Sequence, residues 1–328
     1  LMEIMGLHLP GSAFVHPQSD LRHAVTAMAF HQAVAIQRRS GPPRPLGQIV
    51  DERSFINAII GLHATGGSTN HTLHLPAMAA AAGIDLRWED FADLSDIIPL
   101  LARVYPNGKA DVNQFHAAGG IGFVMRTLLE EGLLDGSAAS IYGENIEDCA
   151  VEPILAGNDI AWRAAPEMSA DEEILRPAIR PHAKTGGLKM LSGNMGRAVI
   201  KISAVEESRH IIKAPAVVFE NEADVKQAFA EGMLDKDCIV VVRAQGPGAC
   251  GMPELHSLTP LLSTLQDKGF KVALVTDGRM SGASGNVPAA IHLCPEAVAG
   301  GPIGQIAEGD IITLDAVTGA LSVDADLS

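Results

Sequence analysis

The sequence predicts an α/β protein with two domains, residues 1–175 and residues 176–328, the second being a β-barrel-like domain flanked by helices. Helical periodicity dominates up to about residue 131, and β-rich runs dominate after residue 187. Between residues 238 and 276 a strand, a loop, a helix and another strand follow one another, as in parallel sheets. A chain of 328 residues is long enough for two domains that each bury a core.

The helices of the first domain are predicted from apolar spacing and from caps. Asp20 precedes a helix over 21–39 whose apolar residues share one face. A proline-rich linker (40–45) follows, then helices over 52–63, from the turn ATGGSTN (64–70) to Met78, from Asp90 to about Ile98, and over 115–131. The first seven residues, LMEIMGL, are interpreted as a helix already under way, and residues 135–176 as the connection between the domains.

The strands of the second domain are short apolar or alternating runs. They are expected within 188–205 and at 214–219, 238–242, 272–275, 311–314 and 320–323, the last two forming a hairpin at Thr318-Gly319. Residues 255–268 carry leucines in helical spacing and supply the crossover that two parallel strands need. This crossover places the loop after 242 and the loop after 275 at one edge of the sheet.

Those two loops hold the strongest candidates for chemistry. The first, QGPGACGMPEL, contains one carboxylate, Glu254, and the second, TDGRMSGASG, contains Asp277, Arg279, Ser281 and Ser284. A carboxylate, an arginine and a serine are therefore expected to converge on one pocket. A pair of ordinary capped turns is the alternative. Arg279 itself is expected to form a structural ion pair with Asp277.

The turn GGSTN offers a second candidate, because Ser68, Thr69 and Asn70 follow two glycines at a helix start, a geometry that suits an anion. A capped turn without a ligand is the alternative. The histidines at 63, 71, 74 and 116 lack a metal-binding pattern, so capping and polar packing are expected of them. Four widely spaced cysteines form no C-x-x-C pair; Cys238 is expected to be inert packing, and Cys250 is a candidate reactive thiol.

Composition excludes several classes of function. A net charge of −15 argues against nucleic acid as a partner and against an anionic membrane surface. No apolar run approaches the length of a membrane span, and we expect a cytoplasmic protein. Nearly half of the residues are hydrophobic but only 4% are aromatic, so small residues are expected to fill much of the interior.

Several long segments resemble one enzyme family, the dihydroxy-acid and sugar-acid dehydratases. They are LMEIMGLHLPGSAFVHP (1–17), GLHATGGSTNHTLHLPAMAAAAGI (61–84), PLLARVYPNGKADVNQFHAAGGIGFVM (99–125), GGLKMLSGNMGRAVIKISAV (186–205) and VRAQGPGACGMPELHSLTPLLSTLQDKGFKVALVTDGRMSGASGNVPAAIHLCPEA (242–297). The resemblance implies an α/β domain followed by a C-terminal β-barrel domain. It also implies a hydro-lyase that turns a 2,3-dihydroxy acid into a 2-keto-3-deoxy acid. The run RVYPNGKADVNQFHAAGG favours 6-phosphogluconate, a phosphorylated sugar acid, as the substrate.

By the same resemblance, Glu254 is a ligand of Mg²⁺ or Mn²⁺ and Ser281 is the catalytic base, with Ser284 as the alternative hydroxyl. The candidates for binding the substrate are Arg279, Ser68, Thr69, Asn70 and Ser284. Candidates for its phosphate are Lys184, Lys189, Arg197 and the GGSTN turn. A serine is a weak base unless a metal lowers its pKa, so its role is consistent only beside that ion.

The family also uses an iron–sulfur cluster, expected to be 4Fe-4S, and its members are typically homodimers. Its three cysteine ligands, the other metal-binding carboxylates and a modified lysine precede the position that matches Leu1, so none of the cluster ligands is expected in this chain. The 328-residue chain is therefore interpreted as the central and C-terminal portion of a longer lyase, with only part of the first domain, and is expected to be inactive alone. Other substrates (a branched dihydroxy acid or a non-phosphorylated sugar acid) and a non-catalytic role are the alternatives.

Overall fold

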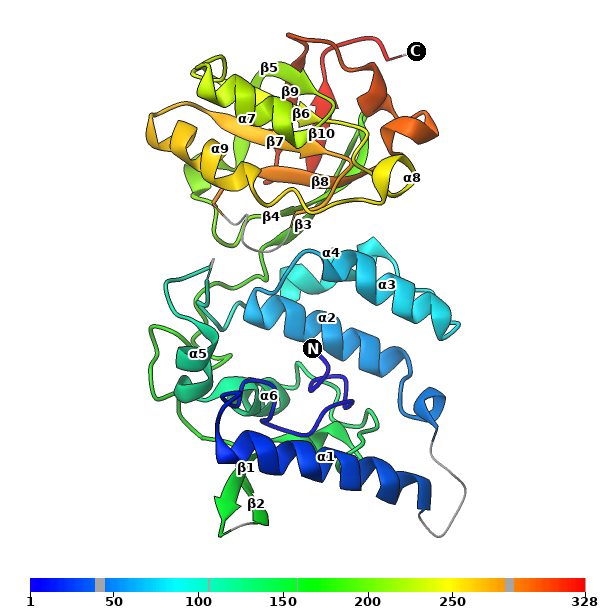
Figure 1. Ribbon diagram of the computed structural model, residues 1–328, viewed down its shortest axis with the longest axis vertical. Coiled ribbons are helices and arrows are strands. Elements are labelled where there is room, and N and C mark those ends of the chain that lie inside the picture. Colours follow the sequence, from blue (N-terminus) through cyan, green and yellow to red (C-terminus); the bar gives the residue numbers. More distant parts are fainter. Residues whose placement is uncertain (39–44, 106, 158, 281–285, 328) are drawn as a thin grey trace. The chain divides into compact units, whose positions relative to one another are not determined.

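The computed structural model describes residues 1–38, 45–105, 107–157, 159–280 and 286–327, and it divides into two compact units (Figure 1). The first unit comprises Leu1–Gly67 and His71–Gly186. The second comprises Ser68–Asn70 and Gly187–Ser328, so a three-residue turn from the N-terminal part of the chain belongs to the C-terminal unit. The predicted domain boundary at residue 175 stays a prediction, and the compact units part at Gly186.

The first unit is mainly helical. Its α-helices are α1 (Asp20–Arg38), α2 (Glu52–Thr65), α3 (His71–Ala81), α4 (Trp88–Ile97), α5 (Val112–Ala118) and α6 (Gly120–Glu130), with the 3-10 turns η1 (Leu46–Gln48) and η2 (Ile146–Cys149). The strands β1 (Val151–Ala156) and β2 (Asp159–Ala164) pair as an antiparallel hairpin.

Helix α2 shows how the sequence determines these elements. Asp51 caps its start by accepting from the Ser54 backbone N–H, and Gly66 ends it in the left-handed conformation at φ 60°. Phe55, Ile59 and most of the other residues of α2 are buried, as the predicted helix over 52–63 requires.

Three expectations for this unit are wrong. The helix predicted over 115–131 is interrupted, because Gly119 and Gly120 both take positive φ (138° and 58°), and α5 and α6 are separate helices. The segment 135–176 is more than a connection, since it contains the β1–β2 hairpin. The first seven residues form turns, and Gly6 at φ 76° ends the single helical turn that the Met5 N–H and the Leu1 carbonyl close at 2.8 Å.

The second unit is a closed barrel, which confirms the predicted fold class. Around the barrel the strand order is β10-β3-β4-β8-β7-β6-β5-β9. The bounds are β3 (Leu188–Gly193), β4 (Gly196–Lys201), β5 (Ile211–Phe219), β6 (Cys238–Val242), β7 (Val272–Thr276), β8 (Ala289–Cys294), β9 (Ile311–Asp315) and β10 (Ala320–Val323). Strand β8 was not predicted; its first five residues are all buried, so it lacks the alternation that marks a half-exposed strand.

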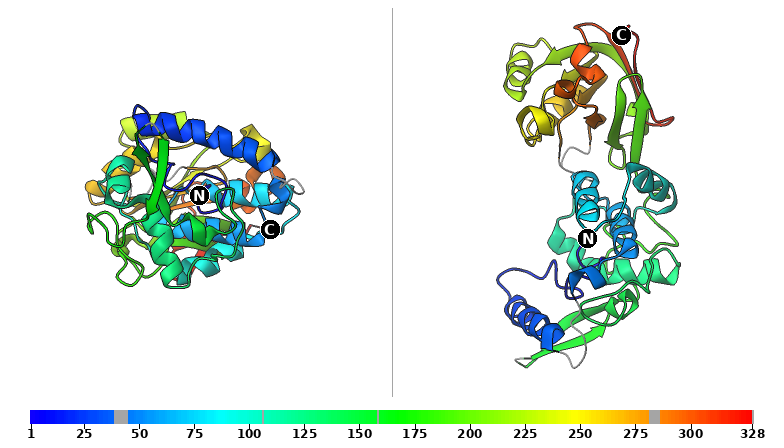
Figure 2. Two further views of the ribbon diagram at one scale, coloured as in Figure 1. Left: turned by 90° about the horizontal axis from the view of Figure 1, so that it is seen from below. Right: turned by 90° about the vertical axis from the view of Figure 1, so that its right-hand side faces the viewer.

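The barrel has a parallel part and an antiparallel part. Strands β5 to β8 are parallel, and α7 (Glu222–Ala230) and α9 (Leu258–Asp267) pack on their outer face (Figure 2). The predicted crossover helix 255–268 is thus confirmed as α9. The remaining helical turns of the unit are η3 (Glu207–Arg209), α8 (Pro247–Cys250), η5 (Ala297–Ala299) and η6 (Pro302–Gln305). Alanines such as Ala198, Ala216 and Ala273 lie in the barrel interior, as the composition predicts.

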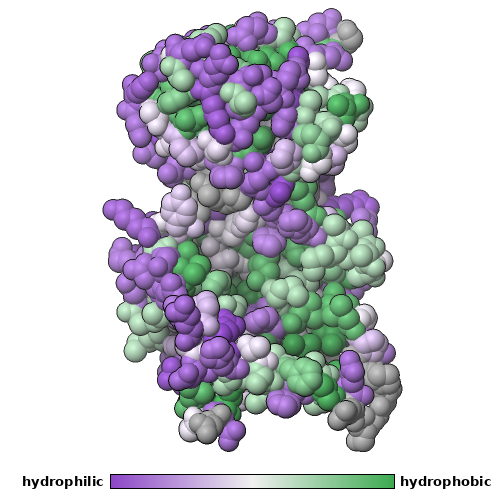
Figure 3. Space-filling model, viewed as in Figure 1, coloured by the Kyte–Doolittle hydropathy of each residue, from purple (hydrophilic) through white to green (hydrophobic). Residues whose placement is uncertain are grey.

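The surfaces of the two units differ in character. In the view of Figure 3 hydrophilic residues cover most of the visible surface of the second unit, while hydrophobic residues gather on part of the first. Exposed apolar side chains of the first unit include Phe30, Leu46 and Ile97. Within the described ranges, no helix combines the length and the apolar character needed to span a membrane.

Candidate active site

The two candidate loops meet at one edge of the barrel, as predicted. Strands β6 and β7 pair in parallel from Cys238↔Val272 to Val242↔Thr276, so the loops that leave them start side by side. Further along, Glu254 and Arg279 form an isolated parallel bridge, and the Leu255 N–H donates to the Arg279 carbonyl at 3.0 Å. The backbone therefore places the side chains of residues 254 and 279 next to each other.

Glu254 and Arg279 form an ion pair. The Arg279 Nη1 atom lies 2.6 Å from Glu254 Oε2, and the two side chains are 30% and 24% exposed. Arg279 Nε donates to the Met252 carbonyl at 2.8 Å, which holds the guanidinium against the first loop. The expected pairing of Arg279 with Asp277 is wrong, because the backbone bridge positions Arg279 beside Glu254 instead.

Asp277 has a different role, as an acceptor for backbone N–H groups. Its Oδ1 atom accepts from Gln245 N (2.9 Å), and its Oδ2 atom accepts from Ala244 N (3.2 Å) and Ala297 N (2.9 Å). The side chain is only 1% exposed, and Ala244 takes the left-handed conformation at φ 57°. Asp277 thus joins the segments that follow β6, β7 and β8 and fixes the base of both candidate loops.

The turn Ser68–Asn70 lies against the same loops. Thr69 Oγ1 donates to the Met280 carbonyl at 2.7 Å, and Asn70 Nδ2 donates to Glu254 Oε2 at 3.3 Å. Asn70 N also donates to Ser68 Oγ at 3.3 Å. The structure therefore brings together Glu254, Arg279 and the GGSTN turn. Sequence spacing carried no signal for this contact, because residues 70 and 254 lie far apart along the chain.

Two oxygen atoms in this cluster have no hydrogen-bond partner among the described residues, Asn70 Oδ1 and Glu254 Oε1, and both are buried. A buried carboxylate or amide oxygen ordinarily meets a donor or a cation, because losing hydration without a replacement costs free energy. Both are hard oxygen ligands of the kind that Mg²⁺ and Mn²⁺ take, so Glu254 fits the metal-binding role. The parts of the chain that the structure describes hold no group of three or more His, Cys, Asp or Glu that could complete a metal site.

Comparison with known proteins shows which family this chain belongs to. Residues 1–149 match the family model "Dihydroxy-acid/6-phosphogluconate dehydratase N-terminal", and residues 173–328 match "Dihydroxy-acid/6-phosphogluconate dehydratase C-terminal". The chain belongs to this dehydratase family.

Relatives within the dehydratase family cover the chain almost completely. It is 56% identical over 324 residues to Phosphogluconate dehydratase of Rhizobium meliloti (strain 1021), covering 98% of this chain and 54% of that protein. It is 51% identical over 326 residues to the protein of the same name from Escherichia coli (strain K12), covering 99% of this chain and 54% of that protein. Identity is 36% over 332 residues to "Dihydroxy-acid dehydratase, chloroplastic" of Arabidopsis thaliana, covering 100% of this chain and 51% of that protein. The chain spans about half the length of the curated relatives that it matches.

Ser281 and Ser284 lie outside the described residues, so their predicted roles stay predictions. The described part of the second loop ends at Met280, whose carbonyl accepts from Thr69 Oγ1. The substrate contacts predicted for Arg279, Ser68, Thr69 and Asn70 also stay predictions.

The histidines take the packing roles that the sequence suggested for them. His63 is buried, its Nε2 lies 2.9 Å from the Phe91 carbonyl, and burial lowers its pKa to about 4. Burial likewise lowers the pKa of His71 to about 4, and the His71 and His74 rings meet edge to face at 6.1 Å. The neutral imidazoles of His63 and His71 pack within the first unit.

Of the two cysteines singled out, Cys238 is buried in β6, where burial raises the pKa of its thiol to about 11, as expected of inert packing. Cys250 is exposed, and its Sγ lies 3.5 Å from the Ala244 carbonyl. Its predicted reactivity stays a prediction.

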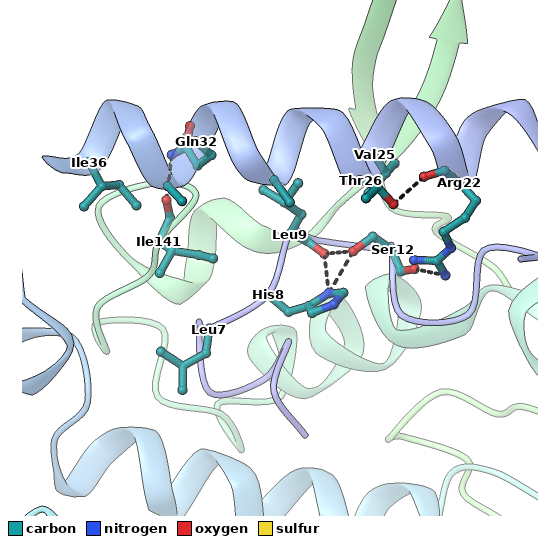
Figure 4. Close-up of a pocket in the computed structure, with 12 residues that line it drawn as sticks. Leu7, His8, Leu9, Ser12, Arg22, Val25, Thr26, Gln32, Ile36 and Ile141 are labelled. Carbon is teal, nitrogen blue, oxygen red and sulfur yellow. Dashed lines mark hydrogen bonds between the residues drawn. The ribbon is translucent and has the colours of Figure 1, made fainter. Parts of the chain in front are cut away.

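A cavity of about 380 Å³ lies in the first unit between α1 and the segment 7–12 (Figure 4). Its lining is mostly apolar, and its polar side chains are engaged within the unit. Arg22 donates to the carbonyls of Ser12, Ala13 and Val15, and Ser12 Oγ contacts His8 Nδ1 at 2.8 Å. None of the predicted site residues lines it, so this cavity is separate from the candidate active site.

Proposed function

We propose that the full-length protein is a hydro-lyase that dehydrates 6-phospho-D-gluconate to 2-keto-3-deoxy-6-phosphogluconate, as in the Entner–Doudoroff pathway. The observation that carries this proposal is the difference in identity between two branches of the family. Relatives named Phosphogluconate dehydratase are 48% to 56% identical to the chain, against 36% for the dihydroxy-acid dehydratase of Arabidopsis thaliana. A dehydratase of another dihydroxy acid or sugar acid is the alternative.

The reaction removes the proton from C2 and the hydroxyl from C3 of the substrate, which together leave as water. The resulting enol then tautomerises to the 2-keto acid. Ser281, acting as the alkoxide, takes the C2 proton and becomes a hydroxyl, and the departing C3 hydroxide regains that proton and leaves as water. Glu254 would hold a divalent cation, Mg²⁺ or Mn²⁺. When bound, such a cation stabilises the negative charge that develops when a proton leaves the carbon next to a carboxylate.

Arg279 and the GGSTN turn prepare the site for this chemistry. The guanidinium neutralises Glu254 Oε2 and leaves Oε1 for the cation. Ser68, Thr69, Asn70 and Ser284 are the further residues proposed to bind the substrate. The full-length protein is also proposed to contain an iron–sulfur cluster. The described residues of this chain include no group of ligands for it, so the roles above are those of this chain's own residues.

The test is an anaerobic assay of 2-keto acid formation from 6-phosphogluconate, with added Mg²⁺ and the full-length protein. We expect turnover, loss of activity in Ser281→Ala and in Glu254→Gln, and near-wild-type activity in the control Asn194→Gln, a barrel residue that bonds Val323. Activity on a branched dihydroxy acid or a non-phosphorylated sugar acid, but not on 6-phosphogluconate, would replace the substrate. Full activity of Ser281→Ala would eliminate the proposed base.

We also propose that the protein is a cytoplasmic homodimer, as the family resemblance implies. Sedimentation equilibrium of the full-length protein measures its mass, and a monomer at micromolar concentration would contradict this proposal.

A further inference from the structure

Asn70 and Glu254 are arranged so that two buried oxygens are left for a ligand. Asn70 Nδ2 donates to Glu254 Oε2 at 3.3 Å. The chemistry fixes the orientation of the amide, because turning it over would point an amide oxygen at a carboxylate oxygen. Asn70 Oδ1 is therefore directed away from Oε2, and it is buried with no donor among the described residues.

The two oxygens of Glu254 are divided between two kinds of partner. Oε2 accepts from Asn70 and pairs with Arg279 at 2.6 Å, whereas Oε1 is buried and meets no donor from the described chain. One carboxylate oxygen is thus neutralised by the protein, and the other retains its capacity to accept.

The turn that carries Asn70 is held in place independently of that contact. Thr69 Oγ1 donates to the Met280 carbonyl at 2.7 Å, and Thr69 is 1% exposed. This bond fixes the backbone next to Asn70, so the amide is positioned before any ligand arrives, as a binding site requires.

We propose that Asn70 Oδ1 and Glu254 Oε1 bind the same divalent cation, which makes Asn70 an additional oxygen ligand from the GGSTN turn. The inference rests on the proposed function, in which Glu254 holds that cation. Amide and carboxylate oxygens are ligands that Mg²⁺ and Mn²⁺ accept, and a cation satisfies both buried oxygens at once. In addition to its proposed place among the substrate-binding residues, Asn70 thus orients Glu254 through Nδ2 and coordinates the metal through Oδ1.

The experiment measures Mn²⁺ affinity of the full-length protein by electron paramagnetic resonance, which requires no substrate turnover. Asn70→Leu keeps the approximate size of the side chain but removes both polar atoms, and we expect it to weaken Mn²⁺ binding by about tenfold or more. Asn70→Asp keeps an oxygen at the Oδ1 position and loses only the donor to Glu254, so we expect Mn²⁺ affinity at or above that of the wild type.

The control is Asn194→Leu, because Asn194 also makes two hydrogen bonds in the second unit, with the Val323 carbonyl and the Val323 N–H, but takes no part in the cluster. We expect it to leave Mn²⁺ affinity unchanged. Circular dichroism of every variant checks that the fold is retained.

The outcomes separate this inference from the proposed function. Wild-type affinity in Asn70→Leu overturns the inference. Equal weakening in Asn70→Leu and Asn70→Asp also overturns it, since the oxygen would then contribute nothing and only the orientation of Glu254 would matter. Wild-type affinity in Glu254→Gln overturns the role of Glu254 in the proposed function, whatever the Asn70 variants show.

Discussion

The carboxylate of Asp277 holds the start of both candidate loops by accepting three backbone N–H bonds. Replacing it with the isosteric amide tests that role. In Asp277→Asn one of the two oxygens becomes an NH₂ group. The wild-type carboxylate accepts one backbone N–H at Oδ1, from Gln245, and two at Oδ2, from Ala244 and Ala297. We expect the remaining amide oxygen to take the Oδ2 position, where it serves two donors.

The cost follows from these three bonds. The Gln245 N–H loses its acceptor in a buried setting, which costs about 1–3 kcal/mol, and the other two bonds change from charged to neutral at about 1 kcal/mol each. The sum is a loss of about 3–5 kcal/mol. The loss is local, because all three donors belong to the segments that follow β6 and β8.

Hydrogen exchange followed by mass spectrometry measures this loss in the full-length protein. A loss of about 3 kcal/mol corresponds to exchange on the order of a hundred times faster in peptides covering 243–246 and 296–299. Asp315→Asn is the matched control, because Asp315 also accepts two backbone N–H bonds, from Val317 and Thr318, but at a partly exposed hairpin turn. If exchange in the two peptides stayed near the wild-type rate in Asp277→Asn, the carboxylate would not support the loops.

Two further predictions concern the stability of each unit. The pKa of buried His63 is lowered from 6.5 to about 4, so the neutral ring stabilises the fold above pH 6.5 and that contribution is lost as the pH falls from 6.5 towards 4. His63→Gln, which retains a donor for the Phe91 carbonyl, should therefore lose thermal stability less steeply across this range, and identical pH slopes for the two proteins would refute the assignment. In the barrel, a Cβ at Gly193 would clash with the Leu321 carbonyl oxygen, so Gly193→Ala should destabilise the second unit by about 2 kcal/mol or more. Urea unfolding measures this, with Gly304→Ala as the control, since its nearest contact would be 3.5 Å, and equal midpoints for the two variants would contradict the close approach of β3 and β10.

Much of the fold could be predicted because its signals are local. The run CIVVV, the leucine spacing of α9 and the run VALVT each lie within a few residues, and together they indicate the parallel unit β6–α9–β7. Strand β8 was not predicted, because burial on both faces removes the alternation of apolar and polar residues. The break between α5 and α6 was not predicted either, because it depends on positive φ at two glycines. Neither feature follows from hydrophobic periodicity.

The part of the candidate site that depends on strand topology could be predicted from the sequence. Parallel strands place Glu254 and Arg279 at one sheet edge, and the structure confirms that they meet. The partners of each side chain could not be derived, because they depend on backbone geometry within the loops. Asp277 and Arg279 have opposite charges two residues apart, which suggested a pair, yet Asp277 faces three N–H groups and Arg279 faces Glu254. The contact between Asn70 and Glu254 joins distant segments, and a single sequence carries no signal for it.

The closing pair of the barrel has a consequence for how the protein is made. Strand β3 is the first barrel strand to leave the ribosome, and it pairs with β10, the last. At typical synthesis rates that delay is on the order of ten seconds, during which one side of β3 has no neighbour. An open strand edge of that kind attracts other chains, so nascent copies on one messenger are exposed to cross-pairing until translation has passed Val323. The order of strands around the barrel therefore leaves the newborn chain with an open strand edge that the finished barrel does not have.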